Sequence, residues 1–210
     1  MRLRVDTRTG QVLLTLPRRA SLKRAVEWAE AKRPWIEAAL AKIVPSTAIQ
    51  PEATIPYRGE PHRIEWQENR GRSVSAHDGM ILVGGPVEAV EARVLRWLRR
   101  EAHVLLERET HEYAAKADVI VTRVSVGDQR SRWGSCSSTG AIRYSWRLIL
   151  VPDHVRRATV AHEVAHRVHM NHGPDFHALV DTLFGAGVKP ANDWLRRHGA
   201  ALHRIGTRAG

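Results

Sequence analysis

The chain has 210 residues, of which 43% are hydrophobic and 26% are charged, as in an ordinary globular protein that buries a core of its own. Its single cysteine, Cys136, excludes an intrachain disulfide and suits a reducing compartment. A net charge of +11 favours acidic partners such as nucleic acid, nucleotides or acidic protein segments. Because the basic residues are scattered along the sequence, a solvated basic surface is the simpler interpretation.

We expect neither a signal peptide nor a membrane span. The N-terminal sequence MRLRVDTRTG lacks the apolar core of a signal peptide. No apolar run approaches the length of about 18 residues that a membrane-spanning helix requires. The sequence therefore favours a cytoplasmic protein without a membrane partner.

The first part of the chain is predicted to be rich in β-strands. Residues 1–16 alternate around a Thr-Gly turn, which predicts two short strands. Residues 21–43 predict a helix that Ser21 caps and Pro34 divides into two pieces. Residues 54–84 carry no helical pattern and predict a small meander of four strands with Gly turns.

The second part is predicted to be mostly helical. Residues 86–117 carry an apolar stripe opposite charged positions, which is typical of a long amphipathic helix. The elements expected after it are a strand over Val119–Val126, a hairpin over 133–150 with its turn near 138–140, and helices from Asp153 to about Met170, near 174–184 and near 189–204.

Five of the twelve histidines lie between positions 162 and 177, and two belong to the motif His162-Glu163-Val-Ala-His166. On a helix, positions i and i+4 lie about 40° apart and one turn along, so both imidazoles can reach one ion at roughly 2.0–2.1 Å. Glu163 stands beside the first ligand and can act on a metal-bound water as general base. The motif arises by chance in roughly one chain in a hundred of this size. Its place on a predicted amphipathic helix, after the small apolar run 158–161, favours a metal site.

A catalytic zinc site needs a third protein ligand and an open position for water. No glutamate follows Glu163, which excludes a thermolysin-like downstream glutamate. The remaining candidates are His169, His172 and His177 and the aspartates at 175, 181 and 193.

Among these candidates we favour His172, with His177 next. On the predicted helix, His169 lies about 4.5 Å beyond His166 and is carried away from the ion. Asn171 can adopt the left-handed turn that ends a helix, and the following Gly-Pro pair prevents continuation, so His172 can fold back. The spacing of His162, His166 and His172 matches the metzincin pattern, but His169 replaces its glycine, so a metzincin proper is not predicted.

The predicted hairpin contributes three further candidates. Cys136 as a fourth ligand would close the site and leave Glu163 without a role, so we interpret it as a small buried residue. Arg143 and Arg147 are candidate substrate-binding residues that can point into the cleft and stabilise an oxyanion. The simpler interpretation of either arginine is a surface or ion-paired residue.

Three stretches of the sequence are distinctive when taken together: Arg-Trp-Gly-Ser-Cys, Ile-Arg-Tyr-Ser-Trp-Arg-Leu-Ile-Leu-Val-Pro, and Val-Ala-His-Glu-Val-Ala-His-Arg-Val-His-Met-Asn-His-Gly-Pro-Asp-Phe. They resemble the YgjP-like metallopeptidase family, which is predicted to contain zinc-dependent hydrolases related to the SprT-like and WLM families. The resemblance covers most of the chain and is strongest from Arg130 to Phe176. It departs from the family at His177, where a bulky aromatic residue is typical.

The resemblance implies zinc ligands at His162, His166 and His172, with Glu163 catalytic. It also implies a zincin-like core in which a small antiparallel sheet lies beside the HExxH helix. The expected fold is α+β, with a β-rich N-terminal lobe containing a helical segment over residues 1–84 and a zincin-like metallohydrolase core over residues 85–210.

The leading hypothesis is a zinc-dependent metallopeptidase. A peptide or protein substrate is expected to pair with an edge strand near residues 141–149. One alternative is a zinc-dependent hydrolase of nucleotide phosphoanhydrides, although the sequence contains no P-loop. The other is a nucleic-acid-binding module with structural zinc, which needs a fourth ligand from Cys136 or His177 and leaves Glu163 unexplained.

Overall fold

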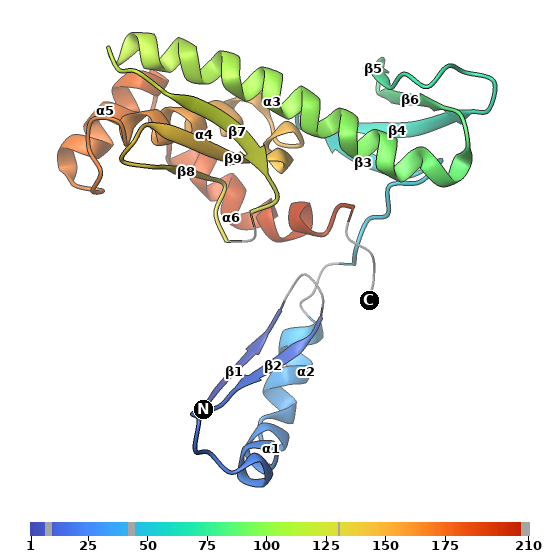
Figure 1. Ribbon diagram of the computed structural model, residues 1–210, viewed down its shortest axis with the longest axis vertical. Helices are drawn as coiled ribbons and strands as arrows, with labels where there is room; N and C mark the ends of the chain where they lie inside the picture. The colour runs from blue at the N-terminus through green and yellow to red at the C-terminus, as the bar shows by residue number, and fades with distance from the viewer. Residues whose placement is uncertain (7–9, 42–44, 130, 207–210) are drawn as a thin grey trace.

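The structure is a computed structural model that describes residues 1–6, 10–41, 45–129 and 131–206. Its first four elements form a small N-terminal unit that extends from the rest of the chain (Figure 1). They are β1 (Arg2–Val5), β2 (Val12–Thr15), α1 (Leu22–Glu30) and α2 (Arg33–Ala41). Ala25 is the one buried residue among the described residues of this unit. The unit therefore adds almost nothing to the main core.

The predicted elements of this unit are confirmed as far as the described residues reach, and the last two residues of the predicted helix, 42 and 43, lie outside them. Strands β1 and β2 pair antiparallel, and the Ser21 hydroxyl caps α1 by accepting a hydrogen bond from the Arg24 backbone N–H. Pro34 lies in the first turn of α2, where its missing N–H costs no helical hydrogen bond, so the helix is divided as expected. The expected Thr-Gly turn includes Thr9, which lies outside the described residues.

A four-stranded sheet follows, with strand order β3-β4-β6-β5. Its strands are β3 (Thr54–Tyr57), β4 (Glu60–Gln67), β5 (Ser75–His77) and β6 (Met80–Gly84). The expected meander is wrong, because β4 and β6 run parallel. After β4 the chain crosses to the far edge of the sheet and returns through a β5–β6 hairpin. Asp78 and Gly79 both have a positive φ at that tight turn.

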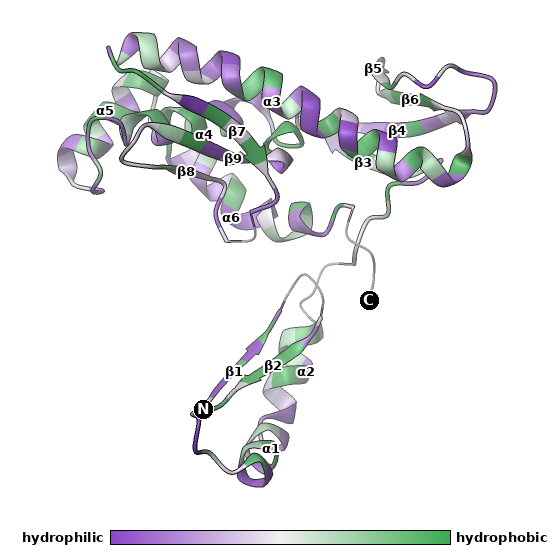
Figure 2. Cartoon of the chain, in the orientation of Figure 1, coloured by the Kyte–Doolittle hydropathy of each residue, from purple (hydrophilic) through white to green (hydrophobic). Residues whose placement is uncertain are grey.

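The long helix α3 (Val90–Lys116), preceded by the short helix η1 (Val87–Ala89), confirms the predicted amphipathic helix. It contacts the four-stranded sheet through β6 and the three-stranded sheet through β7, and it also packs against α4. Apolar and polar residues alternate along it (Figure 2). Its buried side chains include Val94, Trp97, Leu98 and Leu106. One helix therefore supports both sheets.

The three-stranded sheet has strand order β7-β9-β8. It consists of β7 (Arg123–Gly127), β8 (Gly134–Cys136) and β9 (Ala141–Ser145). The predicted hairpin is confirmed as antiparallel β8 and β9, but its second strand ends at Ser145 instead of residue 150. Strand β7 pairs parallel with β9, so the expected antiparallel sheet is mixed. Strand β7 also begins four residues later than predicted. The Val119 N–H instead donates to the Ala114 carbonyl and closes α3.

The remaining elements are η2 (Trp146–Ile149), α4 (Asp153–Ala165), α5 (Pro174–Phe184) and α6 (Lys189–His203). Helices α5 and α6 match their predicted ranges closely. Helix α4 ends five residues before the predicted Met170, and Asn171 is not among the described residues with positive φ. The helix is closed instead by N–H groups of residues 167–169 that bond back to the carbonyls of Val164 and Ala165.

Two contacts fix α4 in the fold. At its first turn, the buried Arg156 guanidinium donates two hydrogen bonds to the buried Glu109 carboxylate of α3, at 3.0 and 2.9 Å. Just before α4, Gly59 at the β3–β4 turn meets Pro152 so closely that an added Cβ would lie 2.7 Å from the proline Cα. The metal-motif helix is therefore tied to α3 and to the four-stranded sheet.

The described residues form a mixed α/β protein of six α-helices and three small sheets, as expected in outline. A single hydrophobic core cluster runs from Ile49 to Ile205. None of the described helices is long and apolar enough to cross a membrane. The boundary between residues 84 and 85 and the zincin-like character of the core stay predictions.

Candidate metal centre

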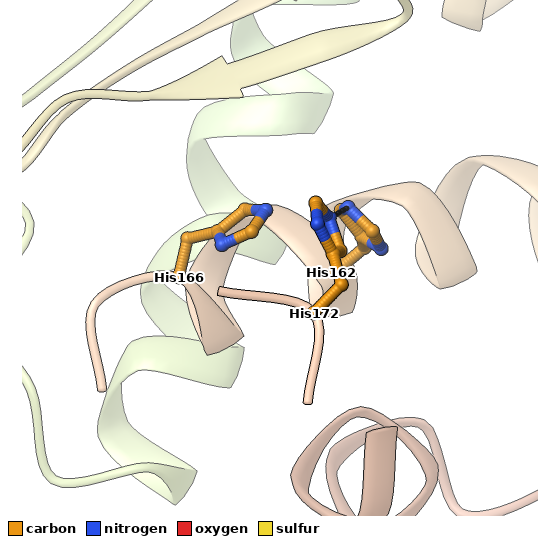
Figure 3. A group of neighbouring side chains, drawn as sticks. All are labelled: His162, His166 and His172. Atoms are coloured by element: carbon orange, nitrogen blue, oxygen red, sulfur yellow. Dashed lines mark hydrogen bonds between the residues drawn. The ribbon is translucent and has the colours of Figure 1, made fainter. Parts of the chain in front are cut away.

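Three histidines converge beside the end of α4 (Figure 3). His162 lies in the last turn of α4, His166 follows its last residue, and His172 comes from the loop before α5. One nitrogen from each ring lies within 4.8 Å of the others. Among the described residues, no other group of three His, Cys, Asp or Glu side chains meets this criterion. The structure therefore brings together the three histidines that the sequence predicted.

The spacing of the ring nitrogens suits one tetrahedral ion. The Nε2 atoms of His162 and His172 face each other at 3.3 Å. Two nitrogens bound to one zinc ion at roughly 2.0–2.1 Å, with tetrahedral angles, lie about 3.3 Å apart. The loop after α4 thus already places His172 at the separation that a shared ion requires.

A backbone contact orients the ring of His166. Its Nδ1 donates to the carbonyl oxygen of His169 at 3.0 Å. This bond places the ring proton on Nδ1 and leaves Nε2 free to bind a metal. His169 lies beyond the end of α4 rather than on it, so its contribution is a carbonyl group and not an imidazole. The sequence could not reveal this role because any residue supplies a carbonyl.

The side chain of Phe176 lies under the three imidazoles. It is fully buried on α5, and its ring centroid is 4.9, 4.5 and 4.8 Å from the rings of His162, His166 and His172. An aromatic surface of this kind restricts the imidazoles to few orientations and excludes water from one side of the group. We did not single out Phe176 from the sequence, where it reads as an ordinary apolar helix residue.

His162 and His166 are held in the neutral form that binds metal. Burial, followed by the charges of the neighbouring histidines, lowers the pKa of His162 to about 4. Burial also lowers the pKa of His166. Both imidazoles are therefore unprotonated at neutral pH and have a free lone pair. Their chemistry and spacing together fit a divalent metal ion.

Glu163 lies beside this group in a nearly dry environment. The residue is 5% exposed, and burial raises the pKa of its carboxyl group to about 7, against the opposing charge of Arg132. Its carboxylate fits against the backbone of Gly134 on β8, where an added Cβ would lie 2.5 Å from Oε1. Only glycine leaves this space. The local signal for Gly134 is the Trp-Gly-Ser sequence, which by itself does not reveal the contact.

A cavity of about 290 Å³ joins these groups. It is lined by the three histidines and Glu163, by Gly134, Ser135 and Cys136 of β8, and by Arg132 and Met170. A buried carboxylate therefore shares one open space with three neutral imidazoles. That arrangement can activate a water molecule next to a bound ion.

The model of one protein family, described as YgjP-like, metallopeptidase domain, matches residues 1–198. The chain belongs to this family. No curated protein and no solved structure matched it. The family resemblance predicted from the sequence is confirmed, and YgjP-like membership implies a metallopeptidase-type hydrolase with a metal cofactor.

In this YgjP-like chain, neither proposed fourth ligand joins the histidine group. Cys136 lines the metal cavity, but its Sγ contacts the carbonyl oxygen of Ser137 at 3.5 Å, and burial raises the pKa of its thiol. His177 is exposed on α5, with its ring centroid 6.4 Å from that of His172. Neither belongs to the group of metal-binding candidates found among the described residues. A tetrahedral ion held by the three histidines alone would have one coordination position left for water.

The two candidate substrate arginines lie in different places. Arg147 is buried, stacks on Trp146, and donates hydrogen bonds to the backbone carbonyls of Leu202 and Ile205. It ties the end of α6 to the core and does not line the metal cavity. Arg143 is exposed on β9 and lines a neighbouring cavity. The arginine that does line the metal cavity is Arg132, which no sequence motif marks as a site residue.

The strand beside the metal cavity is β8, not β9. The expected edge strand near residues 141–149 is wrong, because β9 lies between β7 and β8. The backbone N–H of Ser145 donates to the Trp133 carbonyl, and the backbone N–H of Ser137 donates to the Ala141 carbonyl. The alternation of antiparallel pairs then turns the backbone N–H and C=O groups of Gly134 and Cys136 away from β9. These groups form the free edge of the sheet.

Proposed function

We propose that the chain is a zinc-dependent peptidase in which His162, His166 and His172 hold the ion. The observation that carries this proposal is the convergence of three ring nitrogens within 4.8 Å beside a buried carboxylate in one cavity. The neutral state of His162 and His166 supports it, as does membership of the YgjP-like family. Zinc suits a site of three imidazoles with an open position.

In this proposal Glu163 is the general base. When bound, zinc would polarise the scissile carbonyl and lower the pKa of a water molecule toward 7. Glu163 accepts a proton from the attacking water on a carboxylate oxygen and then delivers it to the leaving amine. In the protein without bound metal, burial raises the pKa of this carboxyl group to about 7, which favours its acceptance of a proton.

The free edge of β8 is the proposed binding site for the substrate backbone. An extended peptide can pair with the outward N–H and C=O groups of Gly134 and Cys136, as in other cases of β-strand addition. Such pairing would hold the scissile bond along the metal cavity, which the same two residues line. Arg132, at the rim, is placed to stabilise negative charge that develops on the carbonyl oxygen.

The test is the substitution Glu163→Gln, which keeps the size of the side chain and removes the base. We expect the variant to bind one zinc ion per chain, measured by mass spectrometry, and to lose casein hydrolysis by about 10²- to 10⁴-fold. Glu88→Gln, at an exposed position on η1, is the matched control and should retain wild-type activity. Hydrolysis by Glu163→Gln at the wild-type rate, or hydrolysis insensitive to chelator, would refute the proposal.

A further inference from the structure

A second, larger cavity of about 580 Å³ adjoins the metal cavity. The two share Arg132, Ser135 and Cys136, so the second cavity begins where the free edge of β8 borders the metal site. From there it extends over β9 to β7, since Arg143 and Arg123 also line it. A substrate bound in the metal cavity can therefore extend into the second cavity, over the outer face of the three-stranded sheet.

Strand register explains which side chains meet in the second cavity. Arg123 pairs with Ala141, and Arg143 pairs with both Ser125 and Ser135, so these side chains share one face of the sheet. The neighbouring side chains of Ile142 and Tyr144 point to the opposite face of the sheet, where both are fully buried. The cavity is thus an open surface of small residues with arginines around it, which suits an extended ligand.

The charged side chains that line this cavity are all positive. Three arginines, Arg123, Arg132 and Arg143, line it, and none of its ten lining residues is acidic. All three are exposed, and no ion pair with a described acidic residue involves any of them. Of the three, Arg132 also lies close enough to Glu163 for its charge to act on that carboxyl group. Arg123 and Arg143, which form no ion pair among the described residues, are available for a carboxylate of the ligand.

Arg143 is also held in place. Its guanidinium lies against the backbone of Gly127 on β7, where an added Cβ would be 2.4 Å from Nη2. The glycine leaves the room that lets the side chain lie along the sheet. A restrained arginine loses less conformational entropy when it binds an anion than a mobile one does.

From this cavity we infer that the enzyme prefers peptides with acidic side chains next to the scissile bond, and that Arg143 and Arg123 select them. The inference rests on the proposed function, and it adds the substrate class. Along a peptide paired with β8, alternate side chains point to the outer face of the sheet and enter the cavity. A polyanion such as single-stranded DNA would meet the same arginines but lacks a bond for the proposed peptidase.

The first experiment compares cleavage of matched peptides. A peptide that the wild type cleaves is amidated at its C-terminus and varied to Glu, Gln or Lys at each position near the cleaved bond. We expect kcat/KM to be about tenfold higher for Glu than for Gln at one or more of these positions. The double variant Arg123→Glu Arg143→Glu should prefer Lys, whereas Arg99→Glu, exposed on α3 and lining neither cavity, should keep the preference for Glu.

The second experiment measures binding without turnover. Zinc-loaded Glu163→Gln protein is titrated against a fluorescent acidic peptide, its Gln counterpart and single-stranded DNA of equal charge. Tighter binding of the acidic peptide, lost on charge reversal at Arg123 and Arg143, supports the inference even if no peptide is cleaved, in which case only the proposed function fails. Cleavage without charge preference, or tighter binding of DNA than of the acidic peptide, overturns the inference and leaves the peptidase proposal standing.

Discussion

The two faces of the three-stranded sheet differ in chemistry although the same strands build both. The inner face buries Ile142 and Tyr144 completely and places Gly134 against the Glu163 carboxylate of α4. The outer face exposes Arg123 and Arg143 beside an open cavity. Because side chains alternate along a strand, adjacent residues serve packing and charge separately. On the inner face, activity depends on the exact position of the Glu163 carboxylate, so a small shift of this group is costly. On the outer face, ligand binding depends on the charge of the exposed arginines and less on the shape of the surface.

The largest effect is expected from breaking the buried ion pair that joins α4, the helix behind the inner face, to α3. Glu109→Ala removes the buried carboxylate from Arg156 and leaves only the more exposed Asp153 as its carboxylate partner, so we expect the free energy of unfolding to fall by about 3 kcal/mol. Glu112→Ala is the control on the same helix. Its side chain is 41% exposed, so its pair with Arg157 should contribute at most about 1 kcal/mol. Urea unfolding measures both, and equal losses would contradict a buried anchor for α4.

The second prediction distinguishes an imidazole that is a proposed metal ligand from one that is not. His172→Ala removes a proposed ligand, and we expect zinc affinity to fall by more than the 10- to 100-fold that is typical for loss of an outer-shell partner. His169→Ala is the matched control, because His169 contributes its carbonyl oxygen and keeps it in the variant. Competition with a chromophoric chelator measures both affinities. If His169→Ala weakens zinc binding as much as His172→Ala, the ligand assignment is incorrect.

A smaller effect on activity is expected from a substitution that only shifts the Glu163 carboxylate. Gly134→Ala adds a Cβ that would lie 2.5 Å from Oε1 of Glu163, so the carboxylate must shift. A misplacement of about 1 Å can cost roughly 10²-fold in rate, so we expect such a loss in kcat with zinc affinity nearly unchanged. Gly187→Ala, where nothing lies within 4 Å of the added Cβ, should be silent. If Gly134→Ala had the kcat of the wild type, the inner face would not require glycine at this position.

Local patterns predicted the features that depend on neighbours in sequence. The amphipathic stripe of α3, the cap at Ser21 and the division at Pro34 each reflect interactions within a few residues. The convergence of His162 and His166 follows from helical periodicity, and the Gly-Pro pair after His172 correctly marked the start of α5. The family resemblance followed from the same motifs.

Features that depend on distant partners could not be predicted in this way. The parallel pairs β4–β6 and β7–β9 result from chain crossings that no strand's own residues specify. Helix α4 ends early because carbonyls near its end are satisfied by a turn, although the residues that follow are compatible with a helix. Phe176, Gly134 and Arg132 read as ordinary residues until the fold places them beside the histidines.

The early end of α4 has one more consequence. Two of the three imidazoles belong to the end of a packed helix, while the third comes from an exposed surface loop. An ion shared among them would act as a clip between the helix end and the segment leading into α5, and free metal at 100 times its dissociation constant would add about 2.7 kcal/mol to the folded state. The concentration of free metal would then determine how well the segment between α4 and α5 resists heat and proteolysis, even without substrate.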